Sequence, residues 1–294
     1  MDYELYHDES LEGGYWHGIL LVPTWKKHEY IELLSQARKN TRHDNKLGIK
    51  DVKQHGRVYD CASAWLQIGI ACLRSTTKGK LEPIFLGKRE KGKMTYEKVN
   101  SFGMKFILFR ERDSHRTINV SVDHAVKIET TFRIALKGGL HYLGSDEEPI
   151  NITKIHFDGH EHMRRNIDHQ RIVGKLSGLR PYCQVATHVG VINDWHSDHD
   201  KPGAQEYDDC QLLQLTDILI GSFRTMLGYK TRDIHGELSR PIKILLDAYS
   251  EGYARMLNSR WCNSFVLSQC YLDGGAWHFE TIEQNHLETQ PTML

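Results

Sequence analysis

The sequence lacks long apolar runs, closely spaced cysteines and any excess of charge. Its longest apolar stretches, such as residues 19–22, fall far short of the roughly 20 residues that cross a bilayer. None of the six cysteines forms a Cys-x-x-Cys pair, which argues against a disulfide scaffold and favours reduced thiols. With 38 basic and 38 acidic residues, the chain also lacks the bulk basicity of a protein that coats nucleic acid non-specifically.

Other familiar signals are missing as well. The N-terminus has no basic segment followed by an apolar one, so we expect no signal peptide and predict a cytoplasmic protein. No phosphate-binding glycine loop, dinucleotide fingerprint or Gly-x-Ser-x-Gly elbow occurs. A chain of 294 residues can bury a substantial core without such staples. We expect one domain over residues 1–280, with insertions within about 40–110, and a polar tail over 281–294.

The order of apolar patterns predicts an α/β fold. The predicted strands cover residues 3–8, 15–22, 47–52, 81–86, 104–109, 152–157, 183–192 and part of 265–279. The predicted helices cover residues 27–39, 58–73, 122–136, 163–176, 211–227 and 241–257. The first two strands should form an antiparallel hairpin, and Gly138-Gly139 should cap the third helix. Strands that alternate with helices after a hairpin favour a sheet with helices on its faces.

Three aspartates stand where an apolar element would normally carry no charge. Asp8 ends the first predicted strand, Asp158 follows the apolar residues 155–157, and Asp217 lies inside the apolar run 212–220. An unpaired buried carboxylate is costly, so a cation or a set of hydrogen-bond donors must compensate each one. Carboxylate oxygens suit Mg²⁺ or Mn²⁺. The pattern predicts a divalent-metal site; taken singly, a cap, a turn or a salt bridge would explain each aspartate.

Two short motifs resemble a bacterial family called domain of unknown function 3800. The Tyr-x-Asp-Glu-Ser run at residues 6–10, with its glycine turn, is similar to the family's opening, and residues 214–221 (Gln-Leu-Thr-Asp-Ile-Leu-Ile-Gly) to its late signature. The resemblance implies a ribonuclease H-like fold, with a mixed five-stranded sheet flanked by helices. It also implies metal-binding acids on strand one, strand four and a late helix, which would be Asp8, Asp158 and Asp217.

This resemblance predicts a divalent-metal-dependent phosphodiester hydrolase, a nuclease that uses Mg²⁺ or Mn²⁺. Active ribonuclease H enzymes usually add a glutamate from the first helix, and no motif identifies that residue here. Glu9, Glu32, Asp51 and Glu129 are candidates, and Glu9 is included in the predicted catalytic set. His160 is included for water activation or phosphate contact.

Several alternatives stay open from the sequence alone. Asp208 and Asp209 would join the metal site if the late helix extends to them, and Asp158, His160 and His162 would suit zinc. Residues 195–200 could form a flap, and the basic stretches 38–57 and 78–93 could follow a phosphate backbone. Other functions are a non-catalytic module of a bacterial defence or mobile-element system and a hydrolase of small nucleotides. Nucleic acid is the expected partner, without a membrane; a second copy of the chain or a defence protein are further options.

Overall fold

The computed structural model describes the greater part of the chain. It covers residues 1–10, 14–73, 85–90, 93–98, 103–112, 124–144, 149–158, 172, 174, 176, 183–194, 207–229, 232–243, 245–246, 264–273 and 276–282. Among these residues, no helix is both long and apolar enough to cross a bilayer.

A seven-stranded mixed sheet forms the centre, in the order β7-β6-β1-β2-β5-β8-β9. The strands are β1 (Asp2–Ser10), β2 (Tyr15–Pro23), β5 (Lys105–Glu111), β6 (Ile150–Asp158), β7 (Cys183–Asp194), β8 (Phe265–Asp273) and β9 (Ala276–Thr281). β2 runs antiparallel to both of its neighbours, β1 and β5. β6 is parallel to β1, β7 to β6, and β8 to β5, whereas β9 returns antiparallel to β8.

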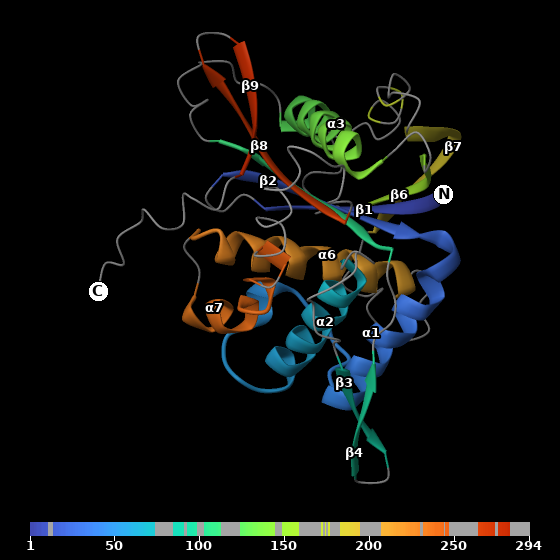
Figure 1. The fold of residues 1–294 in the computed structure, drawn as a ribbon, viewed down its shortest axis with the longest axis vertical. Helices are drawn as coiled ribbons and strands as arrows, with labels where there is room; N and C mark the ends of the chain where they lie inside the picture. The colour runs from blue at the N-terminus through green and yellow to red at the C-terminus, as the bar shows by residue number, and fades with distance from the viewer. Residues whose placement is uncertain are drawn as a thin grey trace, which may run out of the picture.

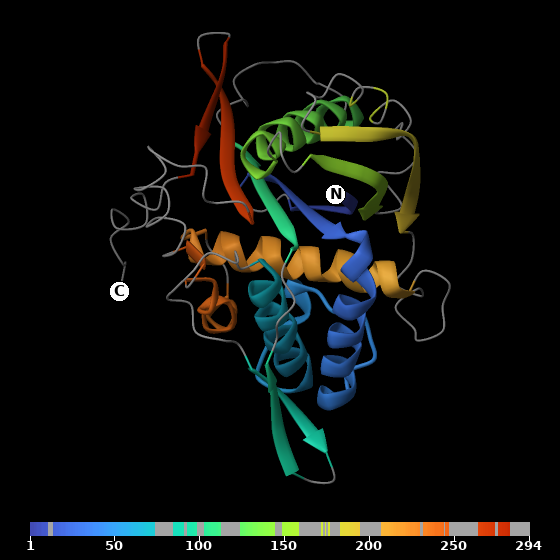
Figure 2. The same cartoon turned by 45° about the vertical axis from the view of Figure 1, so that its right-hand side comes forward.

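Helices cover both faces of this sheet (Figures 1 and 2). The first face carries α1 (Lys27–Thr41), α2 (Arg57–Leu73), α6 (Tyr207–Met226) and α7 (Asp233–Ser239). α3 (His124–Leu143) lies on the opposite face. α6 runs across β1 and β2, and Gly18 allows this close approach, because a Cβ there would lie 2.2 Å from Ile220 Cγ1. We call the two faces the α6 face and the α3 face.

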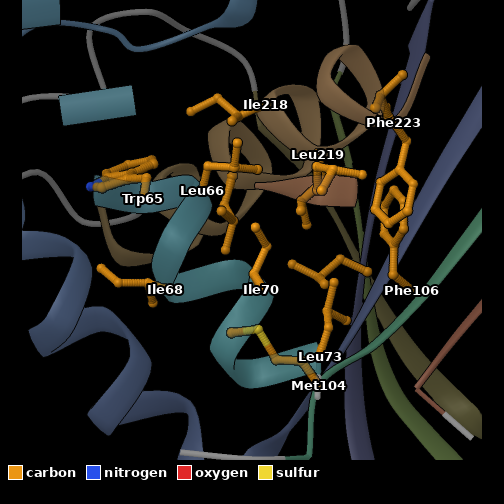
Figure 3. Packing of buried hydrophobic residues seen from close by; sticks show 14 of the residues in the cluster. Trp65, Leu66, Ile68, Ile70, Leu73, Met104, Phe106, Ile218, Leu219 and Phe223 are labelled. Atoms are coloured by element: carbon orange, nitrogen blue, oxygen red, sulfur yellow. The ribbon is translucent and has the colours of Figure 1, made fainter. Parts of the chain in front are cut away.

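Each face has its own apolar core. Figure 3 shows the core on the α6 face, a single cluster that includes Trp65 and Leu66 of α2 and Leu219 of α6. Phe223 of α6 stacks on Phe106 of β5, with ring centroids 5.3 Å apart. A second core lies between the sheet and α3. Burial on both faces explains why β2 is buried along its whole length.

The predicted α/β fold is confirmed at this level, and the strands expected at 3–8, 15–22, 104–109, 152–157 and 183–192 are β1, β2, β5, β6 and β7. Two local predictions are wrong. Residues 47–52 contain a 3₁₀ helix (η2, Ile49–Asp51) in place of a strand. Gly138-Gly139 does not end α3, which continues to Leu143; Gly139 lies so close to Ile107 that a Cβ would be 2.3 Å from its Cδ1.

A small separate sheet interrupts the connection between α2 and β5. It consists of β3 (Phe85–Glu90) and β4 (Lys93–Lys98), paired antiparallel and joined to no strand of the seven-stranded sheet. It lies within the region where insertions are expected. Of the predicted helix at 163–176, the structure describes residues 172, 174 and 176, which are helical. The rest of that helix, most of the predicted helix at 241–257 and most of the tail lie outside the described residues.

Candidate functional site

The side chains of β1 alternate between the two faces of the sheet. Tyr6 belongs to the core beneath α6, and Ser10 accepts a 2.6 Å hydrogen bond from Arg224 of α6. Tyr3 and Leu5 belong to the core beneath α3. Because alternate residues of a strand share a face, Glu4, Tyr6, Asp8 and Ser10 form one row on the α6 face.

Charged side chains from four elements meet on this face, in a group that we call the His156 cluster. Its members are Glu4 and Tyr6 of β1, Lys27 of α1, His156 of β6 and Asp209 of α6. Lys27 Nζ lies 2.7 Å from Glu4 Oε2 and 2.6 Å from Asp209 Oδ1. Tyr6 shares its hydroxyl proton between the same two oxygens, at 3.0 and 2.6 Å. His156 Nε2 donates to Glu4 Oε2 at 2.9 Å.

Local structure explains how these residues meet. Tyr6 and His156 are register partners on the parallel strands β1 and β6, and their rings stack with centroids 4.4 Å apart. Lys27 is the first residue of α1, and Asp209 lies in the first turn of α6. A carboxylate is favoured at that helix end because the backbone N–H groups there carry partial positive charge.

The cluster shifts the acidities of its members. Burial alone would raise the pKa of Glu4, but hydrogen bonds from His156 and Lys27 and their positive charges lower it to about 2. Burial would lower the pKa of Lys27, and its contacts with Asp209 and Glu4 outweigh this and raise it. Burial raises the pKa of Tyr6 well above its usual value, and the charges of Asp209 and Glu4 add to the effect. Glu4 is therefore ionised, and Lys27 and Tyr6 keep their protons, at neutral pH.

Three members of the cluster could hold a metal ion. One ligand atom each from Glu4, His156 and Asp209 lies within 4.8 Å of the others, in a buried position. Two observations count against an ion here. The ammonium of Lys27 already lies against both carboxylates. His156 Nδ1 is buried without a hydrogen-bond partner, whereas a metal-binding histidine normally donates its second N–H to an acceptor. The cluster, as it stands, is an ion-pair network in which both carboxylates share the ammonium of Lys27.

Asp8 lies further along the same row, where β1 approaches its end. Its side chain is buried, and its Oδ1 accepts the backbone N–H of Glu9 at 2.7 Å. The pairing of β1 with β6 runs through His7 and Phe157, so Asp158 is next in register beside Asp8. Asp158 in turn pairs with Asp194, the last residue of β7. Three aspartates thus occupy the ends of three neighbouring strands.

Asp217 has a different position. Its Oδ2 accepts the backbone N–H of Ile49 at 2.7 Å, and a Cβ at Gly48 would lie 2.8 Å from that oxygen. Thr216 and Ile220, by contrast, approach Gly18 in the sheet. Asp217 therefore fixes the loop before η2. Among the side chains that the structure describes, neither Asp8 nor Asp217 belongs to a trio with metal-ligand spacing.

Not every predicted site residue can be placed. Glu9 lies on the α3 face, where Tyr15 donates its hydroxyl to Glu9 Oε2, so it does not share the face of Asp8. His160, His162 and residues 195–200 lie outside the described residues, as does the side chain of Asp158. The set of Asp8, Asp158 and Asp217 as joint ligands stays a prediction, and the trio that the structure does bring together is a different one.

Sequence reasoning missed three of the residues described above. Glu4 and His156 belong to the cluster but are not part of any motif. The sequence did offer one signal for Glu4, because it lies four residues before Asp8 and so on the same face of the strand. Asp194 was missed because its strand was expected to end at residue 192, although the apolar run 185–192 continues into Asn193-Asp194. Asp209 was among the candidates, and the extension of α6 to Tyr207 fulfils the condition set for it.

Comparisons with known proteins do not assign the chain to a family. No protein-family model, no curated protein and no solved structure matches the chain. The resemblance to domain of unknown function 3800 and the ribonuclease H-like fold are therefore predictions without a match behind them. What the chain is shown to be is a mixed α/β sheet, with parallel and antiparallel pairs, that carries a buried cluster of carboxylates and histidine.

Proposed function

We propose that the chain is a divalent-metal-dependent phosphodiester hydrolase, a nuclease of ribonuclease H-like type, with Asp8 and Asp158 as metal ligands. One observation carries this proposal: β1 and β6 pair in parallel up to His7 and Phe157, and Asp8 and Asp158 are the residues that follow on the two neighbouring strands. Neighbouring strands lie roughly 4.8 Å apart. Two carboxylates at that spacing can share one ion.

The residues present fit a hard cation. Asp8 is buried apart from 7 % of its surface, and a carboxylate in such a position is stabilised by a nearby cation. Oxygen ligands of this kind favour Mg²⁺ or Mn²⁺. When bound, such an ion supplies an activated water and stabilises the charge that develops on the phosphate. Asp194 pairs with Asp158 and is a candidate for a further ligand.

In this proposal the His156 cluster has a positioning role. The stacked rings of Tyr6 and His156 lie on β1 and β6, two residues before Asp8 and Asp158. Lys27 and Asp209 tie these strands to α1 and α6. The cluster therefore holds the two strands in register, which sets the spacing of the two aspartates.

The sheet also supports a ribonuclease H-like fold. Three antiparallel strands, β1, β2 and β5, are followed in the chain by the parallel strands β6 and β7 on the other side of β1. Those five strands correspond to the mixed five-stranded sheet that the resemblance implies. β8 and β9 extend it beyond β5.

The test is a cleavage assay with purified protein, Mn²⁺ and labelled single-stranded DNA, duplex DNA, RNA and hybrid. We expect Mn²⁺-dependent cutting of at least one substrate and a loss of about 100-fold or more in Asp8→Asn, equivalent to about 2.7 kcal/mol of barrier. Asp44→Asn is the matched control, because Asp44 is exposed. Absence of cutting by folded wild type, or equal cutting by Asp8→Asn, contradicts the proposal.

A second function is favoured by one observation. The carboxylate of Asp217, the predicted helical ligand, binds the backbone of Ile49. A chain that uses this acid for structure would suit a non-catalytic nucleic-acid or protein binding module. Calorimetric titration with Mn²⁺ separates the two: wild type that binds nucleic acid but shows no Asp8-dependent Mn²⁺ binding is such a module.

A further inference from the structure

We infer that the β3–β4 hairpin is an arm that binds the phosphate backbone of duplex nucleic acid. The inference rests on the proposed function, since it names the surface that would hold the nucleic-acid substrate. Neither the metal site nor the His156 cluster involves this hairpin.

The hairpin belongs to one of the strongly basic stretches of the chain. Residues 74–98 contain eight lysines or arginines and three glutamates, whereas the whole chain has a net charge of zero. The excess of positive charge is therefore local, and the remainder of the chain balances it with acidic residues. Nucleic-acid binding of moderate extent needs such a local patch, and overall basicity is not required.

The register distributes basic positions over both faces of the hairpin. Cross-strand partners in an antiparallel pair share a face. Lys88 pairs with Thr95, and Lys93 pairs with Glu90, which places both lysines on one face. Arg89 pairs with Met94 on the other face, which Lys98 shares as the partner of Phe85. Glu90 and Glu97 share the face of Lys88 and Lys93, so the net positive charge of the paired strands lies on the face of Arg89 and Lys98. That face is the one suited to contact phosphates.

The hairpin stands apart from the rest of the fold. Figures 1 and 2 show β3 and β4 extending beyond the ends of α1 and α2, away from the seven-stranded sheet. An isolated two-stranded hairpin is at best marginally stable in water; within the described residues this one meets the rest of the fold at α2, so binding along its strands would stabilise it further. The charge selects a polyanion, and the major groove of a duplex is wide enough for a two-stranded β-ribbon.

The test compares two triple variants of the full chain. The arm variant carries Lys88→Gln, Arg89→Gln and Lys93→Gln. The control carries Arg133→Gln, Lys137→Gln and Lys154→Gln, which removes the same charge from exposed positions on α3 and β6. Fluorescence anisotropy with a labelled 20-base-pair duplex, in EDTA and over a range of salt concentrations, measures binding without cleavage. Thermal melts verify that each variant is folded.

Each lost phosphate contact lowers the slope of log K against log salt by about 0.9 on B-DNA. We expect the arm variant to lose between about 2 and 3 units of slope and about 10-fold or more in affinity at low salt. The control should stay within about twofold of wild type. A second variant, in which a Gly-Ser linker replaces residues 85–98, should show the same losses of salt slope and affinity as the arm variant.

The outcomes separate this inference from the proposed function. Wild-type slope and affinity in both arm variants overturn the inference, even if the protein cleaves nucleic acid. Arm-dependent binding without cleavage supports the inference and contradicts the proposed hydrolase. If wild type binds no duplex at all in EDTA, the arm is not a nucleic-acid surface, and binding of the hairpin to a protein partner replaces it.

Discussion

Buried polar groups on the two faces of β1 are stabilised in different ways. On the α6 face, Glu4 is compensated by the full positive charge of Lys27 at 2.7 Å. On the α3 face, His7 Nε2 lies 2.8 Å from His17 Nδ1, and His17 Nε2 lies 2.7 Å from Thr131 Oγ1. The first is an ion-pair network, and the second is a chain of hydrogen bonds between groups that can all be neutral.

This difference follows from the alternation of side chains along a strand, which places consecutive residues of a motif on opposite faces of the sheet. His7, Asp8 and Glu9 are consecutive, yet Asp8 faces α6 while His7 and Glu9 face α3. The phenyl rings of Phe132 and Phe157 lie 4.9 and 5.3 Å from the ring of His7, so its surroundings are apolar. An acidic run in a strand therefore supplies ligands to a site from alternate residues only. The predictions below test this contrast, beginning with the largest expected effect.

Removal of the Lys27 ammonium from the α6 face should cause the largest loss in the free energy of unfolding. Lys27→Met leaves two carboxylates without their cation, and we expect a loss of about 2 kcal/mol or more in the free energy of unfolding. A fully buried pair would lose about 3–5 kcal/mol, and Lys27 retains 19 % exposure. Urea denaturation at pH 7 measures the loss. Lys26→Met is the control, with an expected change below about 0.5 kcal/mol; equal losses would show that the cluster does not stabilise the fold.

The α3 face depends on tight packing. Gly139→Ala places a methyl group 2.3 Å from Ile107 Cδ1, and we expect a loss of about 1–3 kcal/mol from overpacking. Gly138→Ala meets no atom within 4 Å and should stabilise α3 by about 0.5–1 kcal/mol through helix propensity. Thermal denaturation of the two variants should give shifts of opposite sign. Shifts of the same sign would contradict this packing of α3 on β5.

Loss of the shared Tyr6 hydroxyl should lower the free energy of unfolding by a smaller amount than loss of Lys27. Tyr6→Phe removes a buried donor from Glu4 and Asp209, which both keep Lys27. We expect a loss of about 1–2 kcal/mol, because hydrogen bonds to charged groups are stronger than the average. Tyr142→Phe, at an exposed tyrosine, should be neutral in the same denaturation experiment. A neutral Tyr6→Phe would mean that water replaces the hydroxyl without cost.

The pH dependence of stability tests the ion pairs on the α6 face separately. The pKa of Glu4 is lowered from 4.5 to about 2 in the folded protein: its burial acts against this shift, and hydrogen bonds with His156 and Lys27 outweigh it. A depressed carboxyl pKa stabilises the fold above the unfolded value, and this contribution is lost as the pH falls from about 4.5 through about 2. Glu4→Gln should therefore lose less stability than wild type between pH 5 and pH 2. The exposed Glu32→Gln should follow the wild-type curve, and coincident curves for all three would exclude a depressed pKa at Glu4.

Alternation and apolar runs predicted much of the fold from the sequence, because they report local burial. They identified β1, β2, β5, β6 and β7 and the place of Asp158 at the end of its strand, whereas β1 continues two residues past Asp8 to Ser10. They could not predict the His156 cluster, since Glu4 and Asp209 are more than 200 residues apart in the chain and no local pattern shows which side of α6 turns toward β1. Asp217 illustrates the same limit: it is only partly buried, and its partner, the backbone of Ile49, was not predicted.

The central claim is that the metal belongs at the strand ends and that the His156 cluster positions them. An anomalous difference map from crystals grown with Mn²⁺ tests it most directly, because both candidate positions lie on the same face of the same two strands. The account predicts a peak between the carboxylates of Asp8 and Asp158, with Lys27 still bound to Glu4. A peak among Glu4, His156 and Asp209, with Lys27 displaced, or no peak at either position, would contradict it.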